Sequence, residues 1–177
     1  WTWLTLANQK LTGVGTHLKF YIEQGGVYSD ITPIRSTTTN AATFAATNGS
    51  TTITVTDSSH GALVGDFVTF TSAVSLGGTI TAAILNAEHQ VVSVTNTNTY
   101  TFTASIAANS SDSGNGGSAT DAAYQINVGP ETVVPLTGWG AGNWGESTWG
   151  NGGTGSVELR LWTQSNFGED LVFGPKG

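Results

Sequence analysis

The chain has 177 residues, which is enough for one domain or two small ones with a real hydrophobic core. Only 10% of the residues are charged and the net charge is −7, so the chain lacks the basic surface that binding to nucleic acid or to an anionic membrane requires. It contains no cysteine, which excludes disulfides, thiolate metal sites and a cysteine nucleophile.

The N-terminal region predicts a β-hairpin. Residues 18–22 and 27–31 are rich in aromatic and β-branched side chains, and Gly25-Gly26 lies between them. Two such runs around a Gly-Gly pair are typical of a hairpin with a tight turn. We expect Thr32-Pro33 to end the second strand, because proline cannot donate to a strand ladder.

From residue 36 to about 127 the composition changes to Thr, Ala, Ser, Asn and Val, without tryptophan. Short runs that alternate or are rich in β-formers predict strands at 51–56, 66–70, 90–94, 99–103 and 123–128. Residues 110–117 read as a long polar loop, and 80–89 is the only stretch with room for a helical turn, with a tight loop at 86–88 favoured. Short strands separated by turn clusters predict an Ig-like β-sandwich or a small barrel.

Tryptophan returns after Gly129, so we interpret 36–127 as an inserted module. Residues 1–35 and 128–177 would then form one discontinuous flank of antiparallel sheet, and the chain would be all-β. In the second half of this flank, 156–162 and 171–173 read as strands, with turns at 165–170 and 174–177. The chain contains no methionine, so we expect a processed product or a segment of a longer protein.

Residues 138–150 hold a ladder of aromatic residues that is the strongest surface candidate in the sequence. Trp139, Trp144 and Trp149 lie five residues apart, and each is followed by glycine. A five-residue step does not match strand alternation, so repeated tight loops fit better. Large apolar rings need a surface to stack on, and three placements stay open: the chain's own fold, a subunit interface, and a ligand platform such as a sugar site.

The sequence offers no convincing catalytic or metal constellation. His17, His60 and His89 share no metal-ligand spacing, and we expect the ring of His60 to bond backbone in a turn. Asp66 at a strand entrance and the Glu169-Asp170 pair are expected to close turns. Asp112 with Asn115 is a thin candidate for Ca²⁺, since one acid gives little affinity. We therefore expect no enzymatic activity and no cofactor.

Several segments resemble tail-associated structural proteins of tailed bacteriophages, particularly those of aquatic environments. The segments are 27–35, 59–68, 86–103, the Gly-Trp-Gly repeats of 138–150 and the Asn-Phe-Gly-Glu-Asp-Leu run of 161–171. The last also resembles a blade of the β-propellers in short-tail nozzle proteins, although the aromatic strand expected after Gly177 is absent. The resemblance implies a non-enzymatic component of the virion tail and carries over no functional residues.

We therefore expect a virion structural protein that assembles into a tail ring, tube or fibre through β edges and the Trp-Gly loops. Its partners would be copies of itself and other virion proteins, with host surface glycans as a further candidate, and neither nucleic acid nor membrane. The alternative is a carbohydrate-binding module that uses Trp139, Trp144 and Trp149. A glycosidase would need two carboxylates about 5–10 Å apart in a cleft, and no such pair stands out.

Overall fold

A computed structural model describes residues 1–127 and 161–176 of the protein. The chain divides into two compact units, a terminal unit of Trp1–Thr32 with Val128–Gly177 and a central unit of Pro33–Asn127. The strands in both units pair antiparallel, which confirms the predicted all-β fold. Within the described residues, no helix has the length and apolar character needed to cross a membrane.

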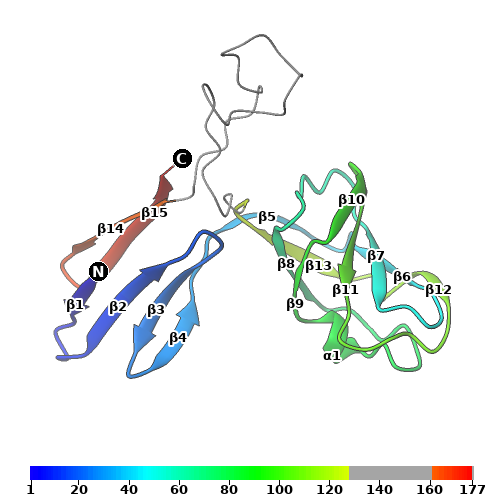
Figure 1. Ribbon diagram of the computed structural model, residues 1–177, viewed down its shortest axis with the longest axis horizontal. Helices are drawn as coiled ribbons and strands as arrows, with labels where there is room; N and C mark the ends of the chain where they lie inside the picture. The colour runs from blue at the N-terminus through cyan, green and yellow to red at the C-terminus, as the bar shows by residue number, and fades with distance from the viewer. Residues whose placement is uncertain (128–160, 177) are drawn as a thin grey trace, which may run out of the picture. The chain divides into compact units, whose positions relative to one another are not determined.

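The central unit is a sandwich of two antiparallel sheets (Figure 1). One sheet has the order β10-β11-β7-β6-β12, with bounds Ser93–Asn96, Thr99–Thr103, Thr52–Thr56, Thr43–Ala46 and Asp112–Asn115. The other has the order β5-β13-β8-β9, with bounds Ile34–Thr38, Asp121–Gln125, Phe67–Thr71 and Glu88–Gln90. A one-turn helix, α1 (Ala82–Leu85), links β8 to β9.

The core of the central unit follows from alternation along its strands. In β7 the sequence Thr-Ile-Thr-Val-Thr buries Ile53 and Val55 and turns the threonines outward. β8 and β11 do the same, so the predicted alternation holds there and Val68, not Phe67, points inward. Phe44 of one sheet meets Phe70 of the other edge-on at 4.9 Å. Each such side chain contributes about 1.5–3 kcal/mol when fully buried.

Two predictions for the central unit are wrong. Residues 90–94 are not one strand, because β9 ends at Gln90 and β10 begins at Ser93 in the other sheet. Between them Val91 donates to Asp66 O and Val92 donates to Thr101 O, so the chain crosses from sheet to sheet at these valines. Residues 110–117 are not all loop, because β12 pairs with β6 despite its polar sequence. The stretch 80–89 does contain a helical turn, α1, although the loop at 86–88 was the favoured prediction, and β9 begins at Glu88.

The terminal unit contains a four-stranded meander and a separate hairpin. The meander has the order β1-β2-β3-β4, with bounds Thr2–Leu4, Lys10–Gly15, Phe20–Gln24 and Val27–Asp30. The predicted hairpin at 18–31 is confirmed as β3–β4. Its two-residue turn, Gly25-Gly26, has φ values of +58° and +89°, which glycine adopts without steric cost. β1 and β2 were not predicted.

The second hairpin consists of β14 (Leu161–Phe167) and β15 (Asp170–Lys176). The predicted turn at 165–170 shrinks to Gly168-Glu169, and the turn predicted at 174–177 is wrong because β15 continues through Pro175 to Lys176. Pro175 lies opposite Trp162 at a position where the backbone nitrogen faces away from β14, so no ladder bond is lost.

Candidate assembly surface

The β14–β15 hairpin covers one face of the meander through an aromatic cluster. Phe20, fully buried on β3, stacks on Phe173 at 4.5 Å and meets Trp162 at 5.0 Å. The indole nitrogen of Trp162 donates to Thr16 O at 2.5 Å, and that of Trp3 donates to Glu169 O at 3.2 Å. Both rings therefore satisfy their polar atom while their apolar body is packed.

Two glycines on β2 make this close packing possible. A Cβ atom added to Gly15 would lie 2.7 Å from Trp162 Cγ, and one added to Gly13 would overlap the amide end of Gln164. In both places the added Cβ would be closer than a normal contact allows. Glycine on β2 therefore makes room for the side chains of β14. The sequence around Gly13 and Gly15 gave no sign of this role, because their partners are about 150 residues away.

The other face of the hairpin exposes apolar side chains. Alternation puts Trp162 and Gln164 toward the meander, and Leu161, Phe167 and Val172 away from it. These three are 55%, 82% and 59% exposed. At the far side of the meander every residue of β4 is exposed, including Val27 and Tyr28. The terminal unit thus combines an aromatic core on one side with unfilled apolar surface on the other.

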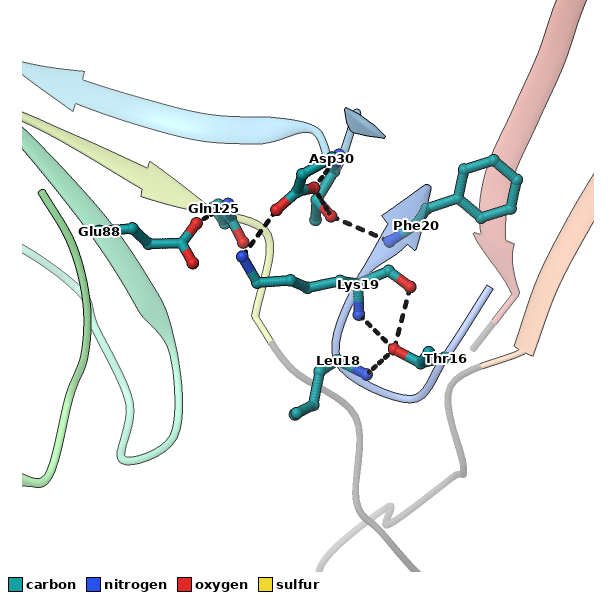
Figure 2. A network of polar contacts seen from close by, with 8 residues as sticks. Thr16, Leu18, Lys19, Phe20, Asp30, Glu88 and Gln125 are labelled. Atoms are coloured by element: carbon teal, nitrogen blue, oxygen red, sulfur yellow. Dashed lines mark hydrogen bonds and ion pairs between the residues drawn. The ribbon is translucent and has the colours of Figure 1, made fainter. Parts of the chain in front are cut away.

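A polar cluster fixes the end of β4 (Figure 2). Lys19 Nζ lies 2.6 Å from Asp30 Oδ2, and Thr32 donates its hydroxyl and its backbone N–H to Asp30 Oδ1. The Thr32 hydroxyl oxygen also accepts from Phe20 N at 2.9 Å. Burial by itself would raise the pKa of Asp30, but the bonds from Lys19 and Thr32 outweigh it and lower that pKa below 3.8.

The central unit contains a second polar cluster, which is closed to solvent. Asp57 Oδ2 accepts from Tyr124 OH at 2.6 Å and from Thr38 Oγ1 at 2.5 Å, and Tyr124 also bonds Tyr100 OH at 3.0 Å. Burial is the main cause of the raised pKa of both tyrosines. Asp57, Tyr100 and Tyr124 are at most 1% exposed, so no substrate reaches them, and the cluster ties the two sheets together.

The predicted turn roles of His60 and Asp66 are confirmed. The Nδ1 atom of His60 accepts from Ala62 N at 2.9 Å, and its Nε2 atom bonds Asn96 O at 3.1 Å. Asp66 Oδ2 accepts from Leu63 N at 2.9 Å, which closes the turn before β8.

The remaining candidates do not meet at one site. His17 lies in the turn between β2 and β3, and Glu169-Asp170 lies at the β14–β15 turn. His89 bonds Ile84 O and stacks on Phe102 at 3.9 Å, and burial lowers its pKa. The structure described for residues 1–127 and 161–176 shows no group of three or more His, Asp or Glu that would hold a metal ion.

Two sets of predicted site residues stay predictions. Trp139, Trp144 and Trp149 lie outside the described residues. Asp112 and Asn115 stand at the two ends of β12, where the amide of Asn115 donates to the Asp112 carboxylate.

Comparison with known proteins places this chain in no family. No family model matches it, and no curated protein matches it. Four chains of solved structures do match, among them the phage phi92 endosialidase, with 22% sequence identity and a TM-score of 0.44. That match covers 64% of this chain and only 18% of the endosialidase chain.

Proposed function

We propose that this protein is a non-enzymatic structural component of a bacteriophage tail that assembles with copies of itself through the terminal unit. The observation that carries the proposal is the exposed apolar surface of Leu161, Phe167 and Val172 on a hairpin whose other face is already packed. A second copy of the chain is the proposed occupant. The assignment to a virion tail is supported by the sequence resemblance of 27–35 and 161–171 to tail-associated proteins.

The composition suits such an interface. Charged residues are 10% of the chain, and interface cores are depleted in charged side chains because their desolvation is costly. The central unit, by contrast, buries its large aromatic residues in its own core, so it does not need a partner to fold. We infer that the terminal unit assembles and that the central unit folds as an independent module.

Sedimentation velocity across a concentration series, with negative-stain electron microscopy of the same samples, tests this proposal. The full chain should associate at micromolar concentration into rings, tubes or filaments. A Leu161→Thr, Phe167→Thr, Val172→Thr variant should shift association to at least about tenfold higher concentration. A matched variant of exposed residues in the central unit, Leu63→Thr, Val64→Thr, Val92→Thr, should associate like the parent. Dispersed monomers at every concentration would sink the assembly proposal.

Sugar binding by the Trp ladder is the second candidate, because Asn143, Glu146 and Asn151 accompany the rings in the sequence. Sugar sites combine aromatic platforms with a few polar side chains. A glycan array probed with the full chain and with a Trp139→Ala, Trp144→Ala, Trp149→Ala variant separates the two functions. Binding that the variant loses supports the sugar role. Loss of assembly without any glycan signal supports an interface role for the ladder.

A further inference from the structure

The outer edge of β4 carries free pairing positions at Tyr28 and Asp30. Val27 pairs with Gln24 across the two-residue turn, and Ile31 N donates to Phe20 O, so residues 27, 29 and 31 direct their backbone groups toward β3. In an antiparallel ladder these groups alternate in direction. The N–H and C=O groups of Tyr28 and Asp30 therefore face outward. In the described part of the chain, no strand pairs with this edge.

Most other sheet edges carry features that discourage pairing. The register of β10 and of β12 is interrupted, β15 contains Pro175, and β1 and β9 have only three residues each. Irregular pairing, proline and short length are the usual protections of an edge strand. β4 has neither irregular pairing nor a proline, and its hydrogen-bonded pairing with β3 continues regularly through Ile31.

We propose that β4 pairs antiparallel with β4 of a second copy, about a two-fold axis at Ser29. This inference rests on the proposed assembly function and names one of its contacts. In that register Tyr28 and Asp30 exchange backbone hydrogen bonds with the Asp30 and Tyr28 of the second copy. Ser29 faces Ser29 in a pair without backbone hydrogen bonds, where side chains come closest and a small residue fits.

The side chains agree with this register on both faces of the sheet. Val27, which is 67% exposed, would lie opposite Ile31 of the second copy, so two apolar pairs form across the axis. On the other face Tyr28 would lie opposite Asp30, whose charge is already balanced by Lys19 at 2.6 Å. The Tyr28 ring would then approach a Lys19–Asp30 ion pair instead of a bare carboxylate. The register therefore brings no uncompensated like charges together.

Cysteine crosslinking in the full chain tests the register, because the protein has no native cysteine. Ser29→Cys puts two thiols at the axis, with Cα atoms about 4.5 Å apart, within the range of a disulfide. Val27→Cys is the matched control on the same exposed strand. Its Cα atoms would lie about 13 Å apart, four residues along the ladder, so no disulfide can form. Under mild oxidation, Ser29→Cys should yield covalent dimer in at least about fivefold excess over Val27→Cys.

A charge variant provides a second, independent measurement by sedimentation velocity. Ser29→Lys puts two ammonium groups together at the axis and should shift association to at least about tenfold higher concentration. Ser105→Lys, at an exposed bend of the central unit, adds the same charge and should associate like the parent. Tryptophan fluorescence checks that each variant keeps the terminal fold.

The outcomes separate this inference from the proposed function. If the parent chain associates but Ser29→Cys crosslinks no better than Val27→Cys and Ser29→Lys has no effect, the β4 pairing is wrong and assembly uses another surface. If the parent chain stays monomeric throughout, the assembly function fails and this inference fails with it. Selective crosslinking together with the Ser29→Lys effect supports both.

Discussion

The central and terminal units are built from the same kinds of strand, but they use their aromatic residues differently. The central unit places Phe44, Phe70, Tyr100 and Phe102 between two sheets, where they are at most 1% exposed. Among the described residues of the terminal unit, only Phe20 at 0% and Trp3 at 6% exposure are buried apolar residues. Phe167 and Tyr28 instead point outward. The central unit buries its large aromatic side chains in its own core. The terminal unit also leaves apolar residues exposed on a sheet edge and on the outer face of a hairpin, and such surface can bind a partner.

This contrast can be measured because the two units carry different reporters. All six tryptophans lie outside residues 33–127, at positions 1, 3, 139, 144, 149 and 162. Tryptophan fluorescence therefore follows the terminal unit alone, while far-UV circular dichroism follows both. We expect two unfolding transitions in urea, with the fluorescence change confined to one of them.

The largest expected effect is on the core of the central unit. Phe102→Ala should lower the free energy of unfolding of this unit by about 3–5 kcal/mol, because it removes a fully buried ring that stacks with His89 and meets Phe70. Urea unfolding followed by circular dichroism measures the loss. The fluorescence transition should not move, and a shift of both transitions together would show that the units unfold as one.

Tyr124→Phe should have the next largest effect on the same unit. It removes the hydroxyl that joins Asp57 to Tyr100 and leaves a carboxylate at 1% exposure with one hydroxyl donor fewer. A hydrogen bond to a charged group contributes about 1.5–3 kcal/mol, so we expect a loss of that size by circular dichroism. The tyrosine ring itself stays, which makes this variant a test of the polar cluster and not of packing. No change would mean that the cluster adds nothing to the sandwich.

In the terminal unit, Gly15→Ala should cost about 1–3 kcal/mol, because the added methyl group collides with the Trp162 ring. The fluorescence transition should move to lower urea while the circular dichroism signal of the central unit stays. Gly174→Ala on β15 of the same unit is the control, since an added Cβ there meets nothing within 4 Å. Equal effects of the two substitutions would contradict the close packing of β14 on β2.

The smallest effect concerns acid stability of the terminal unit. Folding lowers the pKa of Asp30 below 3.8. Its carboxylate therefore stabilises the fold at a pH above the pKa of Asp30 in the unfolded chain, and this contribution is lost as the pH falls through the pKa of the folded state. Asp30→Asn should lower the fluorescence-detected stability at pH 7 and flatten its dependence on pH below about 4. If the stability of the variant depends on pH below about 4 as that of the parent does, Asp30 does not cause the acid sensitivity of the terminal unit.

In both units, the features that the sequence predicted correctly depend on residues close together in the chain. Alternation predicted β7, β8 and β11, because each has a buried face and a period of two that needs no knowledge of its neighbours. The Gly25-Gly26 turn was equally readable, since only glycine adopts both positive φ values freely. The turn-closing bonds, from Ala62 N to His60 and from Leu63 N to Asp66, span two or three residues, which is why these roles could be predicted.

The errors fall where partners are distant in the sequence. β12 has a polar sequence and becomes a strand because β6 offers it an edge, and Val91-Val92 looks like a strand but carries the chain between sheets. Pro175 reads as a turn residue, and its place in the ladder is allowed only by the register of β15 against β14. The Trp ladder stays a prediction.

By itself the sequence determined the fold class, the main alternating strands and the absence of a local motif for catalysis, because these depend on composition and on neighbours a few residues apart. Tertiary structure alone decided that Gly15 makes room for Trp162, how Asp57, Tyr100 and Tyr124 meet between the sheets, and which edge of the terminal unit is left unpaired in the described chain. Such features depend on contacts between strands up to about 150 residues apart, and no local pattern encodes the register in which those strands meet.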